Sequence, residues 1–171
     1  MAWGAAALPT GHAHASEPLL TRQIPSSGER LAAVGLGTWL TFDIALDDAA
    51  ALARRRQVLE RFFHSGGRVI DSSPMYGQAE AVLGELLARG EPRLFSATKV
   101  WTPLGAYGPV QMRRPLSLWK LPRVDLMQVH NLLAWQEHLP ALYAMKAAGR
   151  IRYVGITTSE GRRHAEVEQI M

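Results

Sequence analysis

Four side chains suited to acid–base chemistry follow three apolar, strand-like segments of the sequence. Asp71 ends V-I-D, Lys99 ends S-A-T-K, His130 ends M-Q-V-H, and Tyr76 comes five residues after Asp71. In parallel α/β folds the working groups lie just beyond the carboxyl ends of the strands. These four side chains are therefore expected to converge on one site.

The residue types predict proton transfer at that site. Tyrosine, with an ordinary pKa near 10, is a poor proton donor at neutral pH. A buried ammonium beside it would stabilise the phenolate, and a carboxylate behind the lysine would keep the ammonium charged and in place. Tyr76 then becomes a general acid or base, and His130 orients a substrate oxygen or relays the proton. Lys99 is the one good nucleophile of the set, so a Schiff-base aldolase is an alternative.

Apolar runs with strand-like content recur along the chain between helical patterns. Most are apolar at consecutive positions, which is typical of parallel strands buried on both faces. Two shorter runs, Leu19–Ile24 and Arg30–Val34, flank the turn Pro25–Gly28 and predict a hairpin. The predicted strands after the hairpin are Val34–Trp39, Val69–Ser73, Leu94–Val100, Val124–His130 and Tyr153–Thr157.

The connections between these strands predict helices. Asp47 or Asp48 caps the first helix, which Gly66-Gly67 ends, and Gly90 ends the second. Prolines interrupt the third connection, residues 103–122, and predict a short or kinked helix there. The fourth helix is expected to have Pro140 in its first turn and to end at Gly149.

This β-α order predicts a parallel sheet with right-handed crossovers. Five units fit either an open doubly wound sheet or the first part of an eight-unit barrel of about 250 residues. The segment V-G-L-G-T-W lacks the third glycine of the dinucleotide fingerprint and the helix that should follow it. It therefore does not support the doubly wound fold.

The motifs and their order resemble those of the aldo-keto reductase family. The resemblance covers about residues 19–171 and implies a (β/α)8 TIM barrel, truncated to about five βα units, with an N-terminal β-hairpin that closes the barrel floor. It also implies reduction of aldehydes and ketones to alcohols with NADPH and without a metal. The motifs that carry it are G-L-G-T-W, D-S-S-P-M-Y-G with Glu80 shortly after, A-T-K-V-W, V-D-L-M-Q-V-H-N and R-Y-V-G-I-T-T.

By this resemblance the catalytic tetrad is Asp71, Tyr76, Lys99 and His130, with Tyr76 protonating the carbonyl oxygen. Trp39 and Trp101 match positions that line the substrate pocket. The family commonly has Ser-Asn after the fifth strand, where this chain has Thr157-Thr158. The positions that match the family's nicotinamide contacts are Gly37, Thr38, Asp71, Thr157 and Thr158.

The family's main contacts to the diphosphate and adenosine come from later strands, which these 171 residues do not contain. We therefore expect weak or no reductase activity from this chain alone. Five eighths of a barrel leaves open sheet edges, through which the chain could self-associate. A non-catalytic remnant or binding subunit is the alternative to an enzyme.

Composition excludes several other functions. The net charge is +4, but Lys and Arg are scattered and no nucleic-acid module accompanies them. There is no cysteine, and no apolar run reaches the roughly 18 residues of a membrane span. His64, His138 and His164 show no metal-ligand spacing and are expected to be solvated.

Residues 1–18 form an Ala-rich tail or the remnant of an export signal, and residues 19–171 form the partial barrel domain. As written, the chain is expected in the cytoplasm; an export signal would place it in the periplasm.

Overall fold

A computed structural model describes residues 19–87, 94–159 and 161–171. The predicted tail, residues 1–18, and the predicted helix end at Gly90 lie outside the described residues. No helix within the described ranges is long and apolar enough to cross a membrane.

Five parallel strands form one sheet in the order β3-β4-β5-β6-β7, as the sequence predicts. Their pairing places Gly37 beside Asp71, and Lys99 beside Gln128. The strand ends that carry the predicted site therefore lie next to each other. The strands are β3 (Leu36–Gly37), β4 (Val69–Asp71), β5 (Phe95–Val100), β6 (Val124–Val129) and β7 (Ile151–Ile156).

Each of the five strands differs from its predicted bounds by at least one residue, and β3 differs most. Strand β3 has two residues instead of the six of Val34–Trp39, because the chain turns at Leu40, whose φ is 61°. Strand β7 begins at Ile151, two residues before the predicted Tyr153, because its pairing with β6 already starts at Val124.

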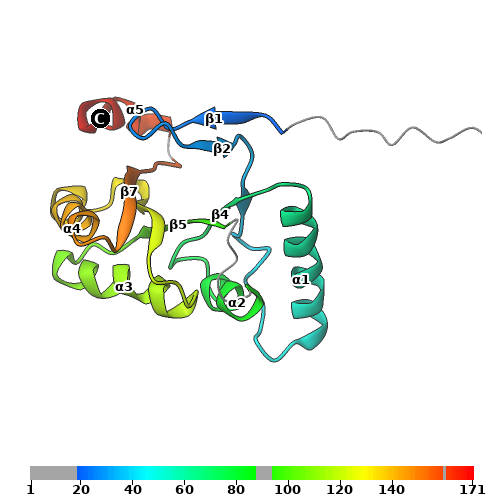
Figure 1. The fold of residues 1–171 in the computed structure, drawn as a ribbon. Coiled ribbons are helices and arrows are strands. Elements are labelled where there is room, and N and C mark those ends of the chain that lie inside the picture. The colour runs from blue at the N-terminus through cyan, green and yellow to red at the C-terminus, as the bar shows by residue number, and fades with distance from the viewer. Residues whose placement is uncertain (1–18, 88–93, 160) are drawn as a thin grey trace, which may run out of the picture.

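Helices follow each of these strands and are arranged in an arc around the sheet (Figure 1). The first helix is capped by Asp48, not Asp47: Asp48 Oδ1 accepts the Ala51 amide at 2.8 Å. Gly66, with a φ of +83°, follows its end as predicted. The helices are α1 (Ala49–His64), α2 (Ala79–Leu86), α3 (Gly108–Leu118), α4 (Trp135–Ala147) and α5 (His164–Ile170).

The prolines interrupt the helices less than predicted. Helix α3 runs for 11 residues with Pro115 inside it, so the third connection holds a helix of ordinary length. Helix α4 begins at Trp135, which places Pro140 inside the helix and not in its first turn. A proline costs one backbone hydrogen bond, and the burial of Met112 and Leu142 on these helices offsets that cost.

His138 is fully buried, so the expectation that it is solvated is wrong. Because α4 begins at Trp135, His138 and Leu142 are one helical turn apart on the buried face. The His138 Nε2–H donates to the carbonyl oxygen of Thr102 at 2.8 Å. His64 and His164 are exposed, as predicted.

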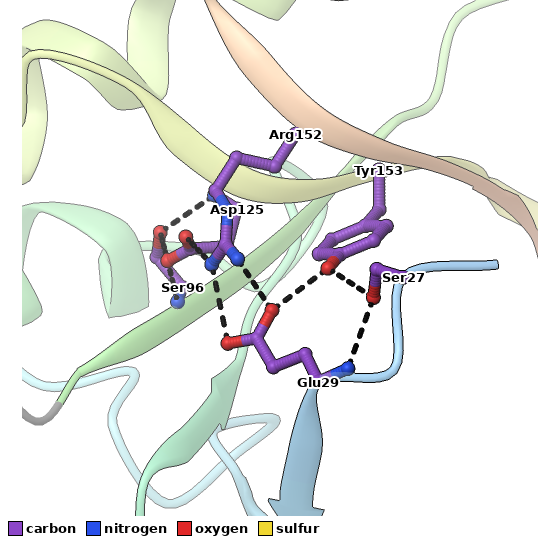
Figure 2. Close-up of polar contacts among 6 residues, drawn as sticks. All are labelled: Ser27, Glu29, Ser96, Asp125, Arg152 and Tyr153. Carbon is purple, nitrogen blue, oxygen red and sulfur yellow. Dashed lines mark hydrogen bonds and ion pairs between the residues drawn. The ribbon is translucent and has the colours of Figure 1, made fainter. Parts of the chain in front are cut away.

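The predicted hairpin is present as β1 (Thr21–Gln23) and β2 (Arg30–Ala32), paired antiparallel. A polar network attaches it to the amino ends of β5, β6 and β7 (Figure 2). Arg152 on β7 bonds both to Asp125 Oδ1, at 2.8 Å, and to the carboxylate of Glu29 beside the hairpin turn. Tyr153 donates to Glu29 Oε2 at 2.7 Å.

The hairpin therefore lies at the opposite end of the strands from the predicted site. Each charged group of this network has a hydrogen-bonding partner of opposite charge. Burial, the largest single influence, would raise the pKa of Glu29, but the hydrogen bonds from Tyr153 and Arg152 outweigh it, and the pKa lies below its usual 4.5.

Candidate active site

Asp71 and Lys99 form an ion pair at the carboxyl ends of β4 and β5. Lys99 Nζ lies 2.5 Å from Asp71 Oδ2 and donates to the carbonyl oxygen of Ser72 at 2.7 Å. The lysine is only 4% exposed. A buried ammonium is stable only with such partners, and this geometry fixes the Lys99 side chain in position.

Tyr76 and His130 complete the predicted group of four. Lys99 Nζ lies 5.0 Å from the centroid of the Tyr76 ring. The ring centroids of Tyr76 and His130 are 6.2 Å apart, and the rings are nearly perpendicular, at 87°. The structure thus brings together all four side chains that the strand ends predict.

His130 is a neutral imidazole in this environment. Burial is the first cause and the nearby Lys99 charge the second; together they outweigh Asp71 and lower the pKa of His130 to about 4. His130 Nδ1 lies 2.8 Å from the hydroxyl oxygen of Thr157, which also accepts the Asn131 amide at 3.3 Å. His130 can therefore donate or accept a hydrogen bond at neutral pH, but it does not supply a proton as an imidazolium.

The residues predicted to contact the nicotinamide have different surroundings. Thr38 is fully buried, and its hydroxyl lies 3.0 Å from the carbonyl oxygen of Asp71 and 2.9 Å from Ser72 Oγ. It therefore supports the Asp71–Ser72 segment from behind. Gly37 is exposed, with nothing within 4 Å of the position that a Cβ would take. Thr157 contacts His130, and Thr158 is half-buried beside it.

The two predicted pocket tryptophans lie beyond the ends of β3 and β5. Trp39 is 62% exposed, and its ring centroid lies 6.4 Å from that of Tyr76. Trp101 is 40% exposed. Its backbone is held by the Gln111 side chain, whose amide donates to Trp101 O at 3.1 Å and whose oxygen accepts from Trp101 N at 2.6 Å.

Comparison with known proteins shows the family of the chain. The model of the Aldo/keto reductase family matches residues 33–170. The chain belongs to the aldo/keto reductase family.

Solved aldo-keto reductases share its fold. One, a putative aldo-keto reductase from Pseudomonas aeruginosa, is 25% identical with a TM-score of 0.69, and the match covers 81% of this chain and 60% of that chain. Another, from Klebsiella pneumoniae in complex with NADP and acetate, is 26% identical with a TM-score of 0.67, and the match covers 79% and 48%. The holo form from Bacillus halodurans, 22% identical, has a TM-score of 0.72, with 87% and 53% covered. The chain spans about half to three fifths of the length of these structures.

Two residues of this aldo/keto reductase site were missed in the sequence. Gln128 Nε2 donates to the second oxygen of Asp71 at 3.2 Å. Asn131, with a φ of 53°, accepts the Ser159 amide at 2.8 Å and so fixes the segment that follows β7. Both stand in the motif M-Q-V-H-N. Gln128 comes two positions before His130, on the same face of the strand, and that spacing is a usable signal.

The described residues offer no metal site: they contain no group of three or more His, Asp or Glu side chains that could hold an ion. The candidate site brings together a phenol, an amine, a carboxylate and an imidazole at one end of the sheet.

Proposed function

We propose that this chain carries the proton-transfer half of an NADPH-dependent carbonyl reductase that converts aldehydes and ketones to alcohols, with Tyr76 as the general acid. The observation that carries the proposal is the position of the Lys99 ammonium. It lies 5.0 Å from the Tyr76 ring and is fixed by Asp71 and the Ser72 carbonyl.

Each member of the tetrad has a role that its surroundings support. NADPH, when bound, supplies the hydride to the carbonyl carbon. Tyr76 donates its proton to the carbonyl oxygen, and the phenolate left behind is stabilised by the Lys99 charge. Asp71 keeps that charge in place. His130 orients the carbonyl oxygen through a hydrogen bond, because it is neutral.

The residues present suit the nicotinamide end of the cofactor. Gly37 and Trp39 leave open surface beside Tyr76, and the Asp71 side chain is 36% exposed. We infer that the flat nicotinamide ring would lie against this exposed surface. The preference for NADPH is supported by relatives that are described as complexes with NADP or NADPH, from Klebsiella pneumoniae.

The surroundings of Lys99 argue against a Schiff-base aldolase. Such an enzyme needs a neutral amine with a free lone pair. Lys99 is almost fully buried, and its Nζ is held by hydrogen bonds to Asp71 and to the Ser72 carbonyl, so it is not free to attack a carbonyl carbon.

The proposal is tested by mixing the chain, at high concentration, with NADPH and an aromatic aldehyde. We expect weak binding, seen in the fluorescence of NADPH, and slow consumption that depends on Tyr76. The variant Y76F should bind NADPH equally well and lose about a hundredfold or more of the rate.

A second variant, Y143F, is the matched control, since Tyr143 is an exposed phenol in the middle of α4 and not at the carboxyl ends of the strands. It should behave like the wild type. Absence of both NADPH binding and Tyr76-dependent consumption would contradict the proposed function.

A further inference from the structure

A buried carboxylate lies behind the tetrad and takes no part in the chemistry described so far. Glu80 is in the first turn of α2 and is only 4% exposed. Its Oε1 accepts the hydroxyl proton of Thr98 at 2.6 Å, and Thr98 is fully buried on β5. Burying a carboxylate this deeply costs free energy, and glutamate is rarely so buried unless it has a partner. Its burial therefore calls for a structural reason.

Both ends of this hydrogen bond are next to tetrad residues in the chain. Thr98 immediately precedes Lys99. Glu80 follows Tyr76 through a short turn, in which Ala79 N donates to Tyr76 O and Tyr76 N donates to Ser73 O, each at 3.0 Å. The bond therefore joins the segment that carries the phenol to the strand that carries the ammonium.

The contact is made on the side of β5 away from Lys99, since neighbouring residues of a strand point to opposite faces. Lys99 meets Tyr76 on one face, and Thr98 meets Glu80 on the other. Two points of attachment fix a segment in position and orientation better than one. The turn is held at one more point, where Gln78 N donates to Asp43 Oδ1 at 2.9 Å.

We propose that Glu80 is a positioning residue for Tyr76, because its bond to Thr98 holds the first turn of α2, and the tyrosine segment before it, against the strand of Lys99. The expected effect of Glu80 on turnover rests on the proposed function. Its expected effect on the position of the Tyr76 segment does not.

Charge alone does not account for the contact. Burial is the main influence and raises the pKa of Glu80, while Thr98, Arg114 and Lys99 act to lower it. An amide oxygen in place of the carboxylate would still accept the Thr98 hydroxyl. The proposal therefore distinguishes Glu80→Gln, which keeps the acceptor, from Glu80→Ala, which removes it.

The experiment measures hydrogen exchange at the amides of Tyr76 and Ala79 in the 171-residue chain. We expect exchange about tenfold faster in E80A and in T98V, as for loss of one buried hydrogen bond. E80Q should resemble the wild type. The double variant E80A/T98V should be no faster than either single variant, because both remove the same bond.

The matched control is V82A, at a fully buried apolar position of the same helix. It should destabilise α2 without a selective effect on the two amides. In Tyr76-dependent NADPH consumption, E80A should lower kcat with little change in the KM for NADPH, and E80Q should restore it.

Three results would overturn the proposal: wild-type exchange in E80A, equal exchange in E80A and V82A at these amides, or additive effects in the double variant. If the wild type consumes no NADPH, the proposed function fails, and the exchange measurement still decides whether Glu80 positions Tyr76.

Discussion

His130 shows how the environment sets the role of one residue. An ordinary histidine has a pKa near 6.5 and would be partly charged at the pH of a cell. Here burial and Lys99 lower it to about 4. Under the proposed function Tyr76 would be the proton donor and His130 a neutral hydrogen-bonding group, so the two roles would not compete.

We predict that His130, followed by the NMR signals of its ring, titrates with a midpoint near 4. In K99M the midpoint should rise toward 6.5 but stay below it, because burial, the larger cause, remains. The surface variant K120M should leave it unchanged, since Lys120 is exposed. A wild-type midpoint near 6.5 would show that this account of His130 is wrong.

Thr157 gives the second prediction at this scale. Its hydroxyl accepts the Asn131 amide and can donate to His130 Nδ1, which leaves the proton on Nε2. T157V should lose this orientation and lower kcat about three- to tenfold, as for one hydrogen bond of about 1 kcal/mol. T157S should retain the wild-type rate. Equal rates in T157V and wild type would show that Thr157 does not orient His130.

For single residues, the sequence predicts the site residues at the ends of strands. It does not predict residues whose role depends on which face of a strand or helix they occupy. Asp71, Lys99 and His130 could be found because each ends an apolar run. Gln128 was missed because its two-residue spacing from His130 was not used, and its place beside Lys99 follows only from the pairing of β5 with β6. His138 was misjudged because its burial depends on where α4 begins.

The order of the helices and strands was predicted correctly, whereas their first and last residues were predicted less accurately. The parallel strands, the hairpin and the Asp48 cap follow from local patterns, and all three are present. The start of α4 was placed too late and α3 was expected to be short or kinked, because tertiary packing carries both helices through a proline that local rules treat as a break. The short β3 reflects the turn at Leu40, a residue with no intrinsic preference for a positive φ.

The hairpin gives a prediction for an element. Glu29 has a lowered pKa, so its ion pair with Arg152 contributes stability above the ordinary pKa of 4.5 and loses it as the pH falls through the folded-state value. E29Q should unfold in urea with about 1–2 kcal/mol less stability at pH 7. As the pH falls below 4.5 and then through the lower folded-state pKa, the gap between E29Q and wild type should narrow, because the unfolded chain takes up the proton first and the folded carboxylate last.

The matched control is E60Q, on the exposed face of α1. It should unfold like the wild type at both pH values. A gap between E29Q and wild type that is constant with pH would show that the ionised form of Glu29 does not attach the hairpin.

At the scale of the whole molecule, the sheet has two edges. In the described part of the chain, β3 and β7 each pair on one side only. The relatives that match are longer, and this chain covers 60% of one of them. Beside β7 lies a hollow of about 320 Å³, lined by Leu139, Tyr143, Val154, Gly155, Ile156, Ile170 and Met171.

We propose that this apolar edge drives self-association of the 171-residue chain. Tyr143, 59% exposed on α4, stands at the hollow, and Met171 is 93% exposed. An unpaired strand beside exposed apolar side chains favours pairing with a second copy. The wild type should therefore show a mass that rises with concentration in size-exclusion chromatography with light scattering. In Y143K the mass should rise only at higher concentration. A lysine at the contact would have to lose its water, and it would repel the same lysine of the second copy. Y107K, an equal change at an exposed tyrosine outside the hollow, should associate like the wild type. A wild type that stays monomeric at every concentration, or equal association of all three proteins, would mean that this edge does not hold two copies together.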